Sequence, residues 1–354
     1  MKTVTIWGYL HHDGGAGTEM LGAVELLRSK GVPVRCVVPE GTDVLDPAEP
    51  RRRYFDSLGV ETVAWRPGIL EGATIFCLGE SSLFDALWRD DATPAKVLYG
   101  STMIGVGALN DAEKAAAAAG TVTSWVFQTE AQKEACEEEA GADLPCVPGY
   151  RPYFNLRSGW LRVPHTLAPK ANDRFNVGRI SRDCPHKWHP ETWEQFARIV
   201  APRPVHFTVM GWGPNAAAKV GDICQPWHKL HGTLNLTWHE HTRDPAALEA
   251  FWREQHVLFH FWDDFVENCP RVIMEAAAAG VPVIANHRGG LPQVIRHGET
   301  GLLFHDPEDA IFYTSNLAFD HAERDRMGAA ARAQLEATYA NPDWCWPWWE
   351  TQLL

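Results

Sequence analysis

Two glutamates in the C-terminal half of the chain, Glu267 and Glu275, are separated by seven residues and could serve one ligand. Every residue of 272–279 other than Glu275 is apolar, which predicts that this carboxylate is buried. A buried carboxylate without a partner costs free energy, so either a lysine or arginine pairs with Glu275 or it faces a polar ligand. The hydroxyl groups of a ribose are suitable donors to it.

The second glutamate is predicted to lie on a helix over residues 270–279. Pro270 suits the first helical position, where its missing N–H costs nothing, and Asn268 is a candidate cap. Gly280 ends the helix, and Pro282 cannot continue it.

The start of this helix is a candidate anion site. Free backbone N–H groups around Asn268, Cys269 and Arg271, together with the helix dipole, attract anions or sugar oxygens. Glu275 would lie about 7–8 Å further along the axis, roughly the distance from a diphosphate to its ribose. Glu267, just before the helix, could accept hydrogen bonds from a sugar beyond the diphosphate. A helix cap combined with a salt bridge in the core would explain the same spacing without a ligand.

A glycine-rich loop near the N-terminus, with the sequence DGGAGTE, follows a short apolar stretch. Gly14 and Gly15 let the backbone approach a phosphate or a sugar closely. The spacing does not match the dinucleotide-binding pattern G-x-G-x-x-G, because Met20 replaces the third glycine, and it is not a P-loop. An ordinary turn and a ligand site are both consistent with this loop.

Short apolar runs alternate with amphipathic stretches along the chain, which predicts parallel sheets covered by helices on both faces. In the first half we predict strands over 4–7, 34–38, 73–78, 96–99, 122–128 and 146–147, and helices over 18–29, 82–89, 111–119 and 130–140. In the second half we predict strands over 174–180, 205–210, 234–237, 257–261, 281–285 and 301–304, and helices over 191–200, 246–254, 270–279, 291–296, 307–319 and 322–339.

The segment 148–173 interrupts this alternation with closely spaced prolines and glycines, and we expect it to connect two domains. The fold class is therefore α/β, with two Rossmann-like, doubly wound domains over 1–165 and 166–335. Ligands bind at the carboxyl ends of parallel strands, so two such edges facing each other would form a cleft. A tryptophan-rich helix over 336–354 is expected to pack across the seam.

The composition is that of an ordinary globular protein, with 45% hydrophobic and 22% charged residues in a chain of 354. A formal net charge of −13 argues against a protein that coats nucleic acid. The three arginines at 51–53 are either a local basic groove or a solvated helix start. No apolar run reaches the roughly 18 residues that span a bilayer, and the first residues predict a strand rather than a signal peptide.

The eight cysteines contain no C-x-x-C pair, so there is no zinc or thioredoxin-like signature. Without an export signal we expect reduced thiols and a cytoplasmic protein. The histidine pairs, His11 with His12 and His239 with His241, come with no convincing ligand set, and we therefore expect no metal site.

Glu267, Glu275 and the sequence AAAAGVPVIANHRGGLPQVIRHGETGLLF that follows resemble the E-x7-E region of GT-B retaining glycosyltransferases, especially glycosyltransferase family 4 (glycosyl transferases group 1). The run VGRI at 177–180 resembles the opening strand of the donor domain in this family, and MGWGP at 210–214 resembles its G-x-G-P turn. The resemblance is strong over 174–305 and weak over the N-terminal half. It implies a GT-B fold, with a C-terminal helix that crosses back.

The resemblance also implies roles for residues of the C-terminal half. Glu275 would bind the ribose, and Glu267 with backbone amides near Asn268 and Cys269 would hold the donor sugar. Arg179 and a downstream lysine, Lys187, would grip the diphosphate, because a departing diphosphate gains negative charge that cations stabilise. Six residues intervene between 180 and Lys187, which is longer than the family spacing, so Arg182 is a rival candidate.

In the N-terminal half, Gly14 and Gly15 resemble the family's glycine pair that touches the donor diphosphate. Many members carry a histidine after a central strand, at a place where this chain has Gly100 and then Ser101. His11 or His12 could fill that space from a neighbouring strand end, and these two histidines together with Ser101 are the candidate contacts to the acceptor or the sugar. Because that histidine contacts the donor sugar in the family, its absence bears on which sugar the chain transfers and on whether it is active.

The expected activity is that of a metal-independent, retaining hexosyl- or pentosyltransferase. Its co-substrate would be a nucleoside-diphosphate sugar, most simply a UDP- or GDP-sugar, with no tightly bound cofactor. The predicted helices 111–119 and 130–140 are acidic or neutral rather than basic, which favours a soluble acceptor over a membrane lipid. A nucleotide-sugar epimerase or hydrolase, and a non-catalytic sugar-nucleotide-binding protein, are the alternatives. The sequence identifies neither the acceptor nor the oligomeric state.

Overall fold

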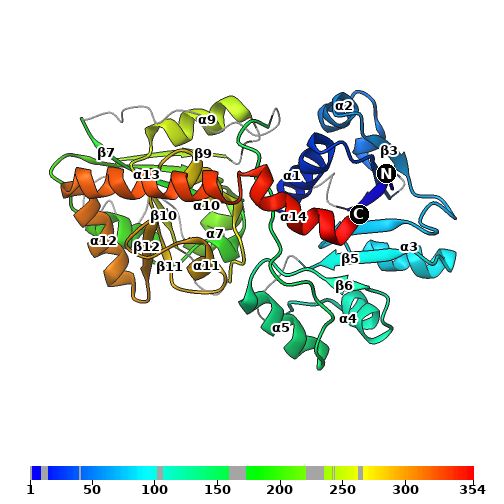
Figure 1. The fold of residues 1–354 in the computed structure, drawn as a ribbon. Coiled ribbons are helices and arrows are strands. Elements are labelled where there is room, and N and C mark those ends of the chain that lie inside the picture. Colours follow the sequence, from blue (N-terminus) through cyan, green and yellow to red (C-terminus); the bar gives the residue numbers. More distant parts are fainter. Residues whose placement is uncertain are drawn as a thin grey trace. The chain divides into compact units, whose positions relative to one another are not determined.

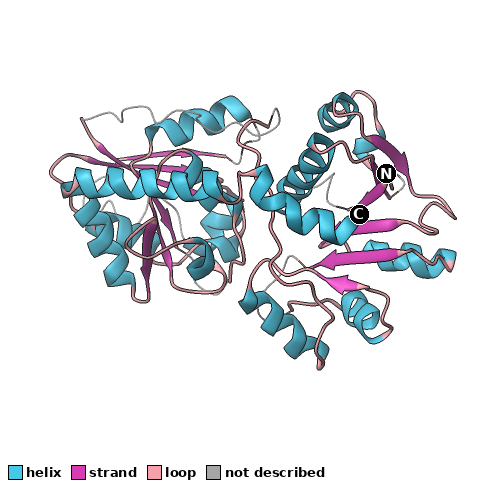
Figure 2. Cartoon of the chain, in the orientation of Figure 1, coloured by secondary structure: helices cyan, strands magenta, loops and turns pink. Residues whose placement is uncertain are grey.

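The computed structural model describes residues 2–8, 15–39, 41–101, 107–158, 173–220, 235–240, 242, 244–261 and 266–354. The chain divides into two units. The N-terminal unit comprises Met1–Asn155 together with Ala337–Leu354, and the C-terminal unit comprises Leu156–Glu336. The first division falls inside the proline- and glycine-rich segment 148–173. In each unit, helices flank a parallel sheet (Figure 2).

The sheet of the N-terminal unit has six parallel strands in the order β3-β2-β1-β4-β5-β6. The strands are β1 (Val4–Trp7), β2 (Val34–Val38), β3 (Glu61–Ala64), β4 (Thr74–Leu78), β5 (Lys96–Gly100) and β6 (Ser124–Trp125). The helices are α1 (Gly15–Ser29), η1 (Asp43–Leu45), α2 (Pro50–Ser57), α3 (Ser82–Asp90), α4 (Asp111–Ala118) and α5 (Glu130–Ala140). Every strand of this sheet except β3 is followed by a helix, as is usual for parallel strands, and β3 leads to β4 through a loop.

The sheet of the C-terminal unit also has six parallel strands, in the order β12-β11-β10-β7-β8-β9. The strands are β7 (Phe175–Ile180), β8 (Val205–Met210), β9 (Leu236–His239), β10 (Val257–His260), β11 (Val283–Asn286) and β12 (Gly301–Phe304). The helices are η2 (Pro185–Lys187), α6 (Thr192–Arg198), α7 (Pro214–Val220), α9 (Pro245–Glu254), α10 (Arg271–Ala278), α11 (Leu291–Val294), α12 (Pro307–Phe319) and α13 (His321–Ala337). The strand order reverses between β7 and β10, where doubly wound sheets bind ligands.

The predicted alternation is confirmed, with three corrections at the edges of the N-terminal sheet. Strand β3 and helix α2 were not predicted, because β3 is a half-exposed edge strand with only a short apolar signal. The strand expected over 122–128 shortens to β6, and the one expected over 146–147 is a single bridge from Trp125 to Cys146. The arginines at 51–53 form the start of α2, where the Glu49 carboxylate caps the helix, so the helix-start alternative is confirmed.

The last helix, α14 (Pro342–Leu353), packs on the N-terminal unit (Figure 1). Trp349 is completely buried, contacts the Phe76 ring edge-on at 4.9 Å, and donates its indole N–H to the Arg151 carbonyl oxygen at 2.9 Å. The Arg151 guanidinium in turn lies 4.6 Å from the ring of Trp344. The tryptophan-rich segment therefore completes the core of the N-terminal unit. Its expected position across the seam stays a prediction.

Replacement of Trp349 by alanine is expected to destabilise the N-terminal unit by about 3–5 kcal/mol, because a buried tryptophan leaves a cavity that neighbours fill only in part. Urea unfolding followed by circular dichroism measures the loss. The matched control is Trp88→Ala on α3, where the indole is 45% exposed. A W349A variant no less stable than W88A would contradict this assignment of α14.

Candidate active site

The candidate site lies in the C-terminal unit, at the carboxyl ends of β7 and β10 and the start of α10. Strands β7 and β10 are hydrogen-bonded neighbours, with Val257 paired to Val177 and Leu258 to Gly178. Their carboxyl ends therefore lie side by side at the point where the strand order reverses. The loop after β7 carries Lys187, and the segment after β10 carries Glu267.

Lys187 and Glu267, 80 residues apart in sequence, form an ion pair. The Lys187 ammonium group donates to Glu267 Oε1, and the two side chains are only 11% and 15% exposed. Burial lowers the pKa of Lys187, and the carboxylate of Glu267 opposes that shift. The structure thus brings together two of the residues that we expected to contact a nucleotide sugar, and it places positive charge beside a carboxylate.

A tight turn after β11 holds the backbone of Glu267. The Gly290 N–H donates to the Glu267 carbonyl oxygen at 3.0 Å. Gly289 has a φ of +59°, and a Cβ atom there would lie 2.3 Å from the same oxygen. Only glycine meets both conditions, so the sequence GG at 289–290 fixes the position from which the Glu267 side chain reaches Lys187.

The helix after Glu267 starts one residue later than predicted. Pro270 occupies the N-cap position with φ −69° and ψ 127°, and it makes no side-chain cap bond. The prediction that Asn268 caps this helix is therefore wrong: the proline ring fixes the extended entry, and helical geometry begins only at Arg271. Asn268 is buried and Cys269 is half-buried, both directly before the helix.

Glu275 lies on α10, half-buried, one helical turn after Arg271. Burial raises the pKa of Glu275 to about 7, while the Arg271 charge and a hydrogen bond from the Trp252 side chain oppose that shift. The sequence left open an internal cation and an external ligand as partners for this carboxylate. The structure places an arginine one helical turn away, and an external ligand as a further partner stays a prediction.

Arg179, near the end of β7, is 1% exposed and lies close to the Lys187–Glu267 ion pair. Its guanidinium carbon is 5.0 Å from the centre of the Trp188 ring, and one Nη donates to the Lys187 carbonyl oxygen. Burial lowers the pKa of Arg179 to about 10, against the opposing charge of Glu267. The expected binding of a diphosphate by Arg179 stays a prediction. In this structure the guanidinium faces the protein interior.

The insertion between Arg179 and Lys187 is anchored by Asp183. Its carboxylate accepts from the backbone N–H of Ala216 at 2.8 Å and from that of Asn215 at 3.3 Å, which caps α7. Arg182, beside Asp183, is exposed to solvent. Of the two rival cations, the structure therefore brings Lys187, and not Arg182, into an ion pair with Glu267.

Sequence reasoning missed three side chains around the site: His260, Trp188 and Trp252. His260 Nδ1 lies 3.5 Å from an Arg179 Nη, and its burial and the charges of Arg179 and Lys187 hold its pKa well below the usual value. A polar residue that ends an otherwise apolar strand at the switch point was a signal that could have identified His260. Nothing local marked the two tryptophans, which are core residues by composition.

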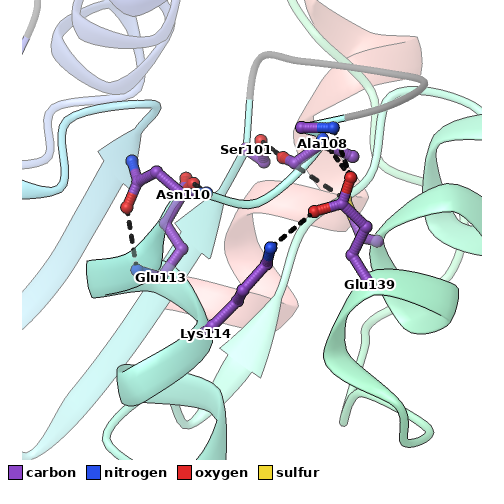
Figure 3. A network of polar contacts seen from close by, with 8 residues as sticks. Ser101, Ala108, Asn110, Glu113, Lys114 and Glu139 are labelled. Carbon is purple, nitrogen blue, oxygen red and sulfur yellow. Dashed lines mark hydrogen bonds and ion pairs between the residues drawn. The ribbon is translucent and has the colours of Figure 1, made fainter.

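The predicted residues of the N-terminal half belong to the other unit, and their part in the site stays a prediction. Gly15 is the first residue of α1, whereas Gly14, His11 and His12 lie outside the described residues. Ser101 is buried, and its hydroxyl donates to the Ala108 carbonyl oxygen at 2.7 Å (Figure 3). Its role toward an acceptor stays a prediction.

The polar network in Figure 3 was not predicted. The Glu139 carboxylate accepts from the Lys114 ammonium at 2.9 Å and from the Ala108 backbone N–H at 3.1 Å. A reciprocal capping box joins Asn110 and Glu113 at the start of α4. These bonds fix Ala108 and the start of α4 to α5.

Within the described ranges, no three or more histidine, cysteine, aspartate or glutamate side chains are grouped so that they could hold a metal ion. Among the helices that the structure describes, none combines the length and the apolar character that a membrane crossing requires.

Residues 173–317 match the family model described as glycosyl transferases group 1. Spore coat protein SA of Bacillus subtilis (strain 168) is 37% identical over 133 residues, which cover 33% of this chain and 35% of that protein. A D-inositol 3-phosphate glycosyltransferase of Corynebacterium glutamicum (strain R) is 37% identical over 111 residues, which cover 27% of this chain and 26% of that protein. The chain thus spans about a third or less of these relatives' length.

Two solved structures resemble the chain over 98–99% of both lengths. The structure of Anabaena Alr3699/HepE in complex with UDP-glucose has a TM-score of 0.70 at 15% identity. Sucrose-phosphate synthase from Thermosynechococcus elongatus has a TM-score of 0.73 at 16% identity. At such identities the likeness establishes the fold. Residues 173–317 are therefore similar to the glycosyl transferases group 1 family, and the two parallel sheets of the chain have the GT-B fold.

Proposed function

We propose that the chain is a retaining glycosyltransferase that moves a sugar from a nucleoside-diphosphate sugar to an acceptor hydroxyl. The observation that carries this proposal is the Lys187–Glu267 pair, which lies directly before the helix that carries Glu275, inside the family-matching residues. These groups bring together a cation, a carboxylate that can accept hydrogen bonds from sugar hydroxyls, a helix N-terminus and a second carboxylate. A UDP-sugar is the preferred donor, because the fold neighbour from Anabaena was solved with UDP-glucose.

Each group of the site has a task in this reaction. The N–H groups at the start of α10 and the Lys187 ammonium stabilise the departing diphosphate. The Glu275 carboxylate accepts from ribose hydroxyls, and Glu267 accepts from hydroxyls of the transferred sugar. The bond from the anomeric carbon to the diphosphate oxygen breaks, and the acceptor oxygen bonds to the same face of that carbon. The acceptor proton passes to the departing phosphate oxygen.

Thermal-shift measurements with a panel of UDP- and GDP-sugars identify the donor, since a bound ligand raises the apparent melting temperature. The donor that binds is then incubated with candidate acceptors, and transfer is followed by mass spectrometry in the presence of EDTA. We expect transfer with retention of anomeric configuration and no loss on chelation. Donor hydrolysis without transfer would indicate a hydrolase, epimerised donor an epimerase, and binding without turnover a non-catalytic protein.

Breaking the buried pair is expected to lower turnover strongly. The variants Lys187→Met and Glu267→Gln should each reduce kcat by about 10²–10³-fold, the usual effect of removing one group that stabilises transition-state charge. The control variants R198M and E308Q break the Arg198–Glu308 ion pair, which is exposed. They should leave kcat within about twofold of the unmodified chain, because exposed pairs contribute little. Full activity in K187M or E267Q would refute the proposed site.

Donor binding should depend on pH through Glu275. Because burial raises its pKa to about 7, the carboxylate is increasingly protonated as the pH falls from 8 to 6, and a protonated carboxyl accepts poorly from ribose hydroxyls. UDP affinity should therefore fall over this range, by at most about tenfold per pH unit. Isothermal titration calorimetry measures the profile, and E275Q should keep only the pH dependence that the titrating terminal phosphate of UDP contributes.

The raised pKa of Glu275 affects stability in the opposite direction: donor binding weakens as the pH falls, whereas the folded state becomes more stable. A carboxyl group whose pKa is raised in the folded state stabilises that state below about pH 4.5, and the contribution is lost as the pH rises through about 7. The melting temperature of the unmodified chain should therefore fall relative to that of E275Q between pH 5 and pH 8. E308Q serves as the control, and parallel profiles for E275Q and the unmodified chain would exclude Glu275 as the titrating group.

A further inference from the structure

Helix α7 begins without a capping side chain of its own. Its first residue, Pro214, has no N–H group, and the residue before it, Gly213, has no side chain that could accept a hydrogen bond. The N–H groups of Asn215 and Ala216, in the first turn, therefore need an acceptor from elsewhere in the chain. An acceptor with a negative charge also suits the positive end of the helix dipole.

Asp183, in the insertion after β7, supplies this acceptor. Its Oδ1 accepts from the Ala216 N–H at 2.8 Å. Its Oδ2 accepts from the backbone N–H of Asn215 at 3.3 Å and from the side-chain amide of the same residue at 3.1 Å. Gly213 leaves room for the carboxylate, because a Cβ atom there would lie 2.4 Å from Asp183 Oδ2. The residue types at 183 and 213 thus serve one contact between the insertion and α7.

Two further contacts hold the insertion against the turn that follows β8. Before Asp183, the Ser181 N–H donates to the Met210 carbonyl oxygen at 3.0 Å. After it, the completely buried ring of Trp188 meets the ring of Trp212 edge-on at 5.1 Å. Asp183 therefore makes the middle one of three contacts along the insertion, and its carboxylate is the charged group among them.

Lys187 lies between two of these contacts, those of Asp183 and Trp188. The Lys187 N–H donates to the Cys184 carbonyl oxygen at 3.0 Å and closes the short helical turn η2. Only Cys184 and this one turn separate Asp183 from Lys187. Fixing Asp183 on α7 therefore also fixes the backbone from which the Lys187 side chain reaches Glu267.

We propose that Asp183 is a positioning residue: by capping α7 it fixes the loop that carries Lys187, and so determines where the lysine charge stands relative to Glu267 and the donor. This inference rests on the proposed function, in which Lys187 stabilises the departing diphosphate. It concerns residues 181–186, the stretch that makes the distance from Arg179 to Lys187 longer than the family spacing. A longer loop loses more conformational entropy when it is fixed, and the contacts of Asp183 offset that cost.

A double-mutant cycle on kcat tests the proposal, because residues that act through one another are not additive. The variants are D183A, K187M and D183A/K187M. D183A should lower kcat by about 10–100-fold, since a small misplacement of a catalytic group has an effect of this size. The double variant should be within about twofold of K187M. Multiplied losses in the double variant would show that Asp183 affects turnover without Lys187, and would overturn the proposal.

The matched control is D306A, which removes another aspartate cap from the same unit. The Asp306 carboxylate accepts from the Glu308 N–H at 2.8 Å at the start of α12. Loss of either cap should lower the melting temperature by about 2–4 °C, but only D183A should lower kcat. A folded D183A variant whose kcat stays within about twofold of D306A would mean that Asp183 only stabilises a helix, and the proposal would be wrong.

Hydrogen exchange tests the anchor without any nucleotide. The amides of Lys187 and Trp188 bond within the insertion, whereas that of Ser181 bonds to Met210 at the end of β8. In D183A the first two should lose protection, Ser181 should keep it, and D306A should change none of the three. Unchanged protection at 187–188 in D183A would overturn the proposal. If the unmodified chain binds neither UDP nor GDP, the proposed function fails, and this exchange result alone decides whether Asp183 holds the loop.

A crystal structure of the unmodified chain with UDP decides the question even if D183A does not fold. The proposal expects the Asp183 carboxylate to remain on the Asn215 and Ala216 N–H groups while the nucleotide is bound. A carboxylate that has moved beyond about 3.5 Å from both nitrogens, too far for a hydrogen bond, would contradict it.

Discussion

The buried ion pair between Lys187 and Glu267 is the interaction around which the candidate site is arranged. Removing two opposite charges from water is costly, and their attraction repays that cost only when geometry and further hydrogen bonds are good. The fold meets this demand by drawing both residues from loops at neighbouring strand ends, β7 and β10. The same strand ends place Arg179 beneath the pair and the start of α10 beside it, so the surroundings of Glu267 are consistently electropositive.

Close approaches between backbones make this geometry rigid. Gly211, with a φ of +88°, lies where a Cβ atom would be 1.7 Å from the Ser181 carbonyl oxygen, and Gly289 packs in the same way on the backbone of Glu267. The loop that carries Lys187 and the segment that carries Glu267 are therefore each pressed against a turn that follows a neighbouring strand. Side chains larger than hydrogen at these two places would displace the charged groups rather than merely crowd them.

Much of the fold and part of the site could be predicted from the sequence, for physical reasons. Fully buried parallel strands produce continuous apolar runs, so ten of the expected strands appeared near their observed places. Edge strand β3 was not predicted, because it is partly exposed and its apolar signal is short. The family resemblance named Lys187 and Glu267 as ligands of one donor, but their ion pair was not predicted, since residues 80 apart carry no local signal of contact.

The burial of Arg179 could not be predicted, because it depends on where Trp188 and three backbone carbonyl groups come together in space. Likewise, the choice between Lys187 and Arg182 required the structure: Asp183 turns the insertion by capping α7, and that turn sets which cation faces inward. The missing cap at Pro270 shows a related limit. Proline marks the region of a helix start reliably, whereas the exact first residue follows from the path by which the chain enters.

The return of α14 to the N-terminal unit has a consequence for biosynthesis. A ribosome releases the six strands of the first sheet long before it makes Trp349, which fills the space beside Phe76. The first unit to emerge is thus the one that matures last, and its unfinished apolar surface stays uncovered while the second unit is being translated. A premature stop codon before the codon for Trp349 would consequently damage the fold of the first half of the polypeptide, far from the lesion in sequence.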